Sequence, residues 1–204
     1  MPGHRKSAAD RKREIVDTTL HLLANLPVET LTTERIAKEV RVSQAAIFRH
    51  FPTKNALWLA VLETVEARAE KEWETALATG LKPLDRLQSV LEAQLGLIAV
   101  TPAVPKLIFG AGHLATESEI RQVPLRIMAR LRAILLHEME VALSRGDLRV
   151  SIPATDLADL LLGLVQGTVL RWQLSGREFD LSAEGRRLVA CQIRLLATEE
   201  YEKT

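Results

Sequence analysis

Hydrophobic side chains recur every three or four positions along most of the chain, which is the spacing of one face of an α-helix. No sustained stretch shows the alternation of β-branched and polar residues that would predict a sheet. Prolines, glycines and hydroxyl side chains divide the hydrophobic pattern into about nine segments. The chain is therefore expected to be all-α, with about nine helices.

The first of these helices is predicted from about Ala8 to Leu26, where Pro27 stops it. His21 lies among its apolar residues and is interpreted as a core or boundary residue. Three further helices are expected to begin at hydroxyl residues that can cap a free backbone N–H group: Thr32, Ser43 and Thr53. The helix that starts at Thr53 is expected to be long and to end near Gly80 and Leu81.

The segment from Thr32 to Leu57 has the pattern of a helix-turn-helix. The apolar face of its first helix is formed by Ile36, Ala37 and Val40. The helix from Ser43 is only about two turns long and needs packing against its neighbours to be stable. Its apolar side is formed by Ala46 and Ile47, and the residues left open to a partner are Gln44, Ala45 and Arg49. A short helix that is held rigidly is suited to reading a DNA groove.

Five further helices are expected downstream, over about residues 83–100, 106–114, 119–144, 155–175 and 182–197. Thr101 to Pro105 is expected to be a loop. Pro124 either lies in the first turn of the third of these helices or kinks it. Thr155 and Ser182 are expected to cap the last two. The inward stripe of the third is predicted at Leu125, Met128, Leu131, Leu135, Met139 and Leu143.

The last two helices are apolar around more of their circumference than one chain needs to bury. Gly163 and Gly167 would allow a second helix to approach closely on one side. A homodimer through these two helices is therefore predicted. The alternative is that both helices belong to the core of a single chain.

Charge is distributed unevenly along the chain. The formal net charge is +1, but residues 1–54 carry ten Lys and Arg against six Asp and Glu, a net of +4. Residues 55–204 carry seventeen against twenty, a net of −3. A basic amino-terminal part fits nucleic-acid binding at one end of the molecule. Arg5 and Lys6 fit either an arm that meets phosphates or a frayed, solvated terminus.

The single cysteine, Cys191, excludes an internal disulfide framework and a clustered zinc site, so no metal site is predicted. The amino terminus lacks the apolar core of a signal peptide. The longest apolar run, Leu160 to Leu170, is too short to cross a bilayer. A soluble protein of the cytoplasm is therefore expected.

The helix-turn-helix segment resembles the amino-terminal DNA-binding domain of the tetracycline-repressor (TetR) family. The resemblance rests on Thr32, Ile36-Ala37, Val42-Ser43, Phe48, His50-Phe51, Lys54 and Leu57. Two positions depart from the family's pattern. Arg41 stands where the family commonly has glycine, and a non-glycine residue with positive φ is uncommon, so a slightly strained or differently shaped turn is expected. Phe48 stands where tyrosine is common, and the lost hydroxyl should weaken phosphate anchoring by about 0.5–1.5 kcal/mol.

The resemblance implies a DNA-binding domain over residues 1–53 and an effector-binding and dimerisation domain over residues 54–204. It implies a transcriptional regulator, expected to be a repressor that a small hydrophobic ligand releases from a palindromic operator. Gln44 is expected to read adenine and Lys54 to meet a phosphate, while Phe48 and Phe51 are expected mainly to pack. The residues expected at the DNA are Thr32, Thr33, Ser43, Gln44, Ala45, Ala46, Phe48, Arg49, His50 and Lys54.

The resemblance also implies an effector pocket among the middle helices, mostly apolar and with few polar contacts. Its candidate lining residues are Trp73, Leu97, Phe109, His113, Met128, Leu131, Leu135, Gln166 and Trp172. The alternative for each is simple core packing, because Met, Leu and Trp at helical spacing are typical of helical cores. No cofactor is expected.

An enzyme is not predicted. The five histidines are scattered, Cys191 has no visible base partner, and the sequence has no glycine-rich phosphate loop or metal-ligand spacing. The remaining alternative to a ligand-responsive regulator is a helical protein-interaction adaptor that DNA merely localises, without ligand sensing.

Overall fold

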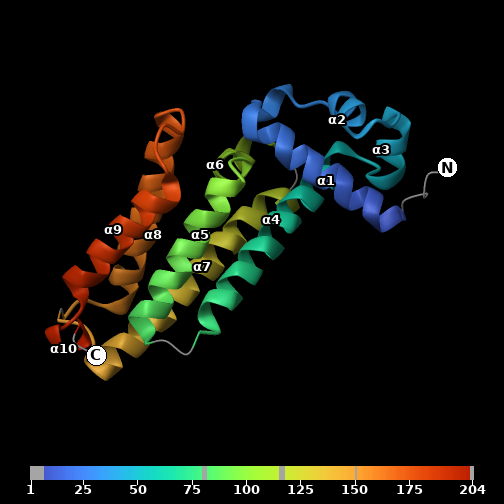
Figure 1. Cartoon of the computed structure of the whole chain (residues 1–204). Coiled ribbons are helices and arrows are strands. Elements are labelled where there is room, and N and C mark those ends of the chain that lie inside the picture. Colours follow the sequence, from blue (N-terminus) through green and yellow to red (C-terminus); the bar gives the residue numbers. More distant parts are fainter. Residues whose placement is uncertain (1–6, 80–81, 115–117, 150, 203–204) are drawn as a thin grey trace, which may run out of the picture. The chain divides into compact units, whose positions relative to one another are not determined.

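The computed structural model describes residues 7–79, 82–114, 118–149 and 151–202, and in these ranges the chain is all-α (Figure 1). The helices are α1 (Ala8–Asn25), α2 (Thr33–Val40), α3 (Gln44–His50), α4 (Lys54–Leu77), α5 (Pro83–Val100), α6 (Ala103–Leu114), α7 (Ser118–Arg145), α8 (Ala154–Leu174), α9 (Leu181–Leu196) and α10 (Glu199–Glu202), with a 3-10 turn, η1, over Val28–Thr30. Because α10 is a single turn, the nine longer helices of the described ranges confirm the predicted fold class and number.

The three predicted caps of the amino-terminal part are confirmed. The Thr32 hydroxyl accepts a hydrogen bond from the Arg35 backbone N–H at 3.2 Å. Ser43 and Thr53 accept in the same way from residues three positions later, at 3.2 and 3.0 Å. Each cap satisfies one of the backbone donors that a helix start leaves without a partner.

The predicted caps of the last two long helices were wrong. Helix α8 starts after Pro153, without a side-chain cap, and the Thr155 hydroxyl instead lies 3.3 Å from the Asp156 carboxylate. Helix α9 is capped by Asp180, whose carboxylate accepts from Ala183 N–H at 3.0 Å, so Ser182 already lies inside the helix. Both helices therefore begin one or two residues earlier than the hydroxyl pattern indicated.

One proline-containing segment differs from expectation, and another fits one of its two predicted placements. Helix α6 begins at Ala103, so the expected loop is confined to Thr101 and Pro102. Pro105 is accommodated because first-turn backbone nitrogens have no helical acceptor to lose. Pro124 lies inside α7, which begins at Ser118. Helix α4 ends at Leu77, and its expected end near Gly80 and Leu81 lies outside the described residues.

By contact density the chain forms two compact units, and the first comprises residues 1–68 and 101–125. Within it, α1 packs against α2, α3 and α6, and η1 also contacts α6. Ile15 and Leu23 of α1 are completely buried. His21 is exposed, contrary to its interpretation as a core or boundary residue, because it lies on the outward face of α1.

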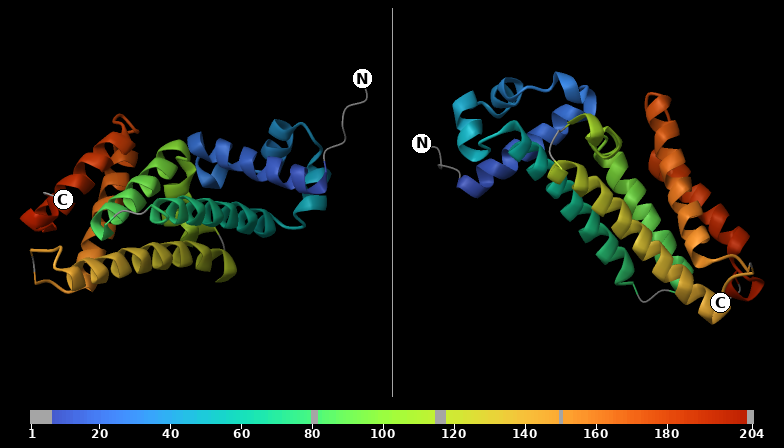
Figure 2. Two further views of the ribbon diagram at one scale, coloured as in Figure 1. Left: turned by 60° about the horizontal axis from the view of Figure 1, so that its bottom comes forward. Right: turned by 180° about the vertical axis from the view of Figure 1, so that it is seen from behind.

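The second unit comprises residues 69–100 and 126–204, and its main contact is between α5 and α9. Gly185 of α9 allows this contact, since a Cβ atom there would lie 2.4 Å from Leu95 Cδ1 of α5. Helix α8 packs on both α5 and α9, and α8 and α9 lie side by side in both views of Figure 2. Helix α7 is joined to α5 by a bidentate ion pair between Glu138 and Arg86. Its shortest contact, from Arg86 Nη2 to Glu138 Oε2, is 2.7 Å.

The predicted inward stripe of α7 is only partly correct. Leu131, Leu135 and Met139 are buried, whereas Leu125 is 61% exposed. Met128 and Leu143 are intermediate. The buried face is instead completed by Ile120, Val123, Ile127, Ile134 and Ala142.

Within the described ranges, the length and hydropathy of the helices rule out a membrane-spanning helix.

Candidate nucleic-acid interface

The turn between α2 and α3 is closed by an arginine in the left-handed conformation. Arg41 has φ 60° and ψ 48°, and the Val42 N–H donates to the Ala37 carbonyl at 2.9 Å. This pattern is the usual way for a helix to end on glycine. Of the two expected outcomes, a slightly strained or a differently shaped turn, the structure fits the first, because Arg41 adopts the positive φ at which glycine is usual.

Helix α3 has only seven residues and is held by one buried side. Ile47 is completely buried, and Phe51, just after the helix, is 5% exposed. Ile36, Ala37 and Val40 of α2 are also buried, and α3 contacts both α2 and α1. Packing therefore fixes a helix that would not be stable alone.

The opposite side of α3 is open. Ser43, Gln44, Ala45 and Arg49 are exposed, and Ala46 and His50 are half-buried. On the flanking helix starts, Thr32 and Lys54 are exposed and Thr33 is half-buried. Every residue predicted at the DNA is thus at least partly accessible in the free chain.

Gln44 is held in place by the neighbouring helix. Its side-chain Nε2 donates to the Thr33 hydroxyl oxygen at 2.8 Å, across the turn. The hydroxyl takes one of the two amide hydrogens, which leaves the second hydrogen and the Oε1 acceptor of Gln44 open. An amide with one free donor and one free acceptor has what bidentate recognition of adenine requires.

Phe48 does not pack as expected. It is 40% exposed on α3, because Ile47 and Phe51 already fill the buried side of the helix. The packing role predicted for Phe51 is confirmed. The ammonium of Lys12 on α1 lies 5.8 Å from the centre of the Phe51 ring, a contact that no local sequence pattern indicates.

The other basic residues of α1 are engaged with their own helix. Arg11 pairs with Glu14 at 2.7 Å, and Arg13 lies 3.7 Å from Asp10. Arg5 and Lys6 lie outside the described residues. Lys12, Arg49 and Lys54 are exposed basic side chains on or beside the helix-turn-helix.

The described candidates for an effector pocket all belong to the second unit. Trp73, Leu131, Leu135 and Trp172 are buried there. Three further candidates are half-buried: Leu97, Met128 and Gln166. The side chains of Phe109 and His113 lie outside the described residues.

Both buried indoles among these candidates have a hydrogen-bond acceptor. Trp73 Nε1 donates to Gln94 Oε1 at 3.0 Å, and Trp172 Nε1 donates to the Phe179 carbonyl at 3.0 Å. These hydrogen bonds fix the orientation of the two rings. A fixed ring is compatible with either a pocket wall or a packed core. Across the part of the chain that the structure describes, no group of three or more His, Cys, Asp or Glu could hold a metal ion.

Comparison with known proteins identifies the helix-turn-helix. Residues 15–61 match the sequence model of a family described as "Bacterial regulatory proteins, tetR family". The nucleoid occlusion factor SlmA of Vibrio vulnificus is 30% identical over 187 residues, which are 88% of this chain and 91% of that protein.

Solved structures share the fold over nearly the whole length. One, described as a transcriptional regulator from Saccharomonospora viridis in complex with choline, is 22% identical with a TM-score of 0.82, over 94% of this chain and 100% of that one. FadR from Bacillus subtilis, in complex with stearoyl-CoA, is 17% identical with a TM-score of 0.73, over 90% and 98%. The amino-terminal helix-turn-helix domain and the carboxy-terminal helical body are thereby confirmed.

The family match covers the helix-turn-helix, and the relative at 30% identity extends it over most of the chain. The chain therefore belongs to the tetR family of bacterial regulatory proteins, which are DNA-binding regulators and not enzymes.

Proposed function

We propose that the protein is a repressor that binds a palindromic operator as a homodimer and is released by a small hydrophobic ligand. The observation that carries the DNA-binding part is the pairing of Gln44 with Thr33 on the open side of a rigidly packed α3. A base-reading side chain that is already fixed loses less conformational entropy on binding. The cytoplasm, where the DNA is, is the proposed location.

In this proposal α3 enters the major groove of the DNA. Gln44 reads adenine, and Ala45 and Ala46 contact a thymine methyl group. Lys54, at the first position of α4, brings its charge and the free N–H groups of the helix start to a phosphate. The remaining proposed contacts, to phosphate and sugar, are Thr32, Thr33, Ser43, Phe48, Arg49 and His50.

Dimerisation through α8 and α9 is supported by apolar side chains that one chain leaves uncovered. Leu160, Leu170 and Leu174 of α8 are 54–79% exposed. Gly163 and Gly167 lie between them, and a Cβ atom at either would meet no other atom within 4 Å. Leu195 of α9 is 61% exposed. Pairing these faces in two copies would place two α3 helices on one DNA face, with half-sites about 34–36 Å or somewhat more apart.

We propose that residues 1–53 form the DNA-binding domain and that residues 54–204 form the domain for effector binding and dimerisation. The proposed effector pocket uses the described candidates of the second unit, whose side chains are mostly apolar. Support comes from the structural neighbours, whose descriptions name bound choline and stearoyl-CoA. Release from the operator requires that the ligand bind the conformation that cannot bind DNA more tightly than the conformation that can.

A second candidate function is a DNA-localised adaptor for other proteins, without ligand sensing. The observation that favours it is the name of the relative at 30% identity, a nucleoid occlusion factor. A pull-down in nuclease-treated extract that yields a stoichiometric protein partner would favour the adaptor.

The proposed function is tested by selecting bound DNA from a random pool and titrating the selected site with salt. A palindromic site whose affinity falls linearly with the logarithm of salt concentration is expected. A non-palindromic site would contradict the dimeric arrangement, and no enrichment would contradict operator binding. A small-molecule screen on the selected site then tests release.

A further inference from the structure

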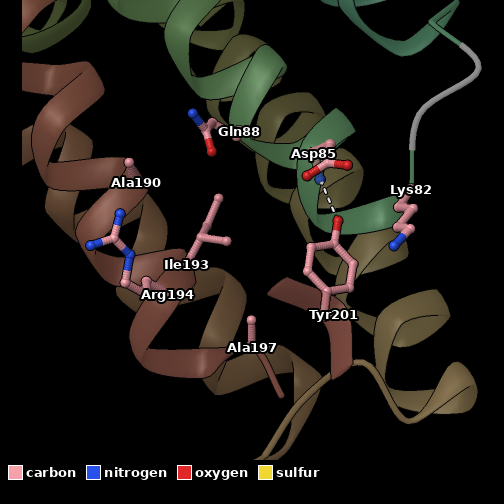
Figure 3. A pocket seen from close by; sticks show the side chains of 8 residues that line it. All are labelled: Lys82, Asp85, Gln88, Ala190, Ile193, Arg194, Ala197 and Tyr201. Atoms are coloured by element: carbon pink, nitrogen blue, oxygen red, sulfur yellow. Dashed lines mark hydrogen bonds between the residues drawn. The ribbon is translucent and has the colours of Figure 1, made fainter. Parts of the chain in front are cut away.

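A cavity of about 640 Å³ lies in the second unit, and none of its lining residues is among those proposed to line the effector pocket. It is formed by the start of α5, the end of α9 and α10. Its lining residues are Lys82, Asp85, Gln88, Ala190, Ile193, Arg194, Ala197 and Tyr201 (Figure 3). Its volume is in the range of pockets that hold small molecules in proteins.

Two cations of this cavity lack a carboxylate partner within the described ranges. The Lys82 ammonium lies 4.9 Å from the centre of the Tyr201 ring, and within the described ranges it has no hydrogen-bond or ion-pair partner. The Arg194 guanidinium has no hydrogen-bond or ion-pair partner in the same ranges. The two neighbouring arginines of α9 differ, since Arg186 pairs with Glu92 at 3.3 Å and Arg187 with Glu184 at 3.0 Å.

Two acidic residues of α5 lie at or near the cavity: Glu92, which is paired, and Asp85, which belongs to the lining. Glu92 accepts from Gln88 Nε2 at 2.8 Å in addition to its pairing with Arg186. The backbone N–H of Asp85 donates to the Tyr201 hydroxyl at 3.0 Å, and burial together with the Asp85 carboxylate raises the pKa of Tyr201. Tyr201 therefore stays neutral beside Asp85. The Asp85 carboxylate also belongs to the lining, so the cavity carries the two cations of Lys82 and Arg194 against one carboxylate.

The arrangement of the two cations limits what can satisfy both. Figure 3 shows the Lys82 and Arg194 side chains on opposite sides of the cavity, with Ile193 and the Tyr201 ring between them. A single carboxylate would reach one side, whereas a molecule with a negative group at each end would reach both. Ile193, Ala190 and Ala197 offer an apolar surface to its middle.

We propose that this cavity binds a small organic dianion, namely a dicarboxylate with a short aliphatic chain whose ends pair with Lys82 and Arg194. Guanidinium and ammonium groups form charge-assisted hydrogen bonds with carboxylates. The chain covers Ile193 and removes apolar surface from water. This site is additional to the proposed hydrophobic effector pocket.

The proposed dimer leaves the cavity accessible. At about 100° per residue, the cavity-lining Ala190 and Ile193 of α9 lie about 140–160° around the helix axis from Leu195, and Arg194 lies about 100° from it. Leu195 is the exposed leucine assigned to the dimer face. Ligand binding and dimerisation therefore use different sides of α9.

The test is amide NMR of the full-length protein titrated with straight-chain dicarboxylates from succinate to sebacate. We expect shifts at Asp85, Gln88 and Ala190, and a dissociation constant that passes through a minimum at one chain length. Hexanoate, with a single carboxylate, is expected to bind about tenfold more weakly than the best diacid. Hexane-1,6-diamine, with the charges reversed, is expected not to shift these amides.

Arg194→Met and Lys82→Met should each raise the dissociation constant about tenfold and remove the advantage of the diacid over hexanoate. Arg130→Met and Lys71→Met are matched controls, because both side chains are exposed and outside the cavity. Equal binding of hexanoate and the best diacid, or shifts that persist in both cavity variants, would overturn the proposal. Tighter binding of acetyl-Glu-Ala-Ala-Glu-amide than of any diacid would assign the site to an acidic protein segment instead.

Discussion

The ammonium of Lys106 on α6 donates a hydrogen bond to the Leu23 carbonyl at the end of α1, at 2.9 Å. The carbonyls of Ala24 and Leu26 also accept from it, at 3.2 and 3.3 Å. The last carbonyls of a helix have no partner within the helix and carry its negative end, so a cation there is favourable. One side chain thus fastens the helix that supports α2 and α3 to α6, within the first unit.

Replacing Lys106 by Met should lower the free energy of unfolding by about 2 kcal/mol, because three carbonyls lose a charged donor. Urea-induced unfolding followed by circular dichroism measures this loss. Lys71→Met, at an exposed lysine of α4, is the matched control and should be neutral. A Lys106→Met protein as stable as the control would show that the carbonyls are satisfied equally well by water.

The ion pair between Arg86 and Glu138 predicts a larger effect. Glu138 is 4% exposed, so Arg86→Met would leave a carboxylate buried without its principal partner. We expect a loss of about 3 kcal/mol in unfolding free energy. The double variant Arg86→Met with Glu138→Leu should recover most of it, because the pair is replaced by apolar packing. If the double variant is no more stable than Arg86→Met, burial of an unpaired charge is not the cause of the loss.

These contacts show where sequence reasoning succeeds and where it stops. Thr32, Ser43 and Thr53 could be identified because a cap and its donor lie three residues apart. The partners of Lys106 lie 80 to 83 residues away, and Glu138 is 52 residues from Arg86. No local pattern encodes such pairs.

The local errors have local causes. Thr155 and Ser182 were expected as caps because hydroxyl residues are good caps, but a proline and an aspartate just before them start the helices. Leu125 was assigned to the core from spacing alone, and the buried face of α7 is set by the helices around it. In the helix-turn-helix, the pattern identified the open residues but not the bond between Gln44 and Thr33.

The dependence of stability on pH should reveal a carboxylate shared by two helices. Hydrogen bonds from Arg187 of α9 and then Arg171 of α8 lower the pKa of Glu184 from 4.5 to about 2. The stabilisation is therefore fully present above pH 4.5 and is lost as the pH falls towards 2. Glu184→Gln should lower the melting temperature at pH 6, and its difference from the wild type should shrink between pH 4.5 and 2. Glu178→Gln, at an exposed carboxylate, should show no such convergence.

The bond between Thr33 and Gln44 predicts a selective loss of operator affinity. Thr33→Val keeps the shape of the side chain but removes the acceptor, so Gln44 must be ordered on binding. We expect operator affinity to fall by about 1 kcal/mol, with binding to unrelated DNA unchanged. In a Gln44→Ala background the same substitution should have no further effect. Additive losses in the double variant would mean that Thr33 acts independently of Gln44.

The effect of replacing Lys54 should not depend on the DNA sequence, because a contact to phosphate does not distinguish one base from another. Lys54 is exposed at the first position of α4, where its charge adds to the free N–H groups of the helix start. Lys54→Ala should weaken binding to the operator and to unrelated DNA alike, and reduce the slope of log affinity against log salt concentration by about 1. Lys71→Ala, at an exposed lysine further along α4, should leave the slope unchanged. Fluorescence anisotropy between 50 and 200 mM salt, a range suited to such slopes, measures both variants. An unchanged slope for Lys54→Ala would remove this lysine from the phosphate contacts, and a loss confined to the operator would make it a base-reading residue.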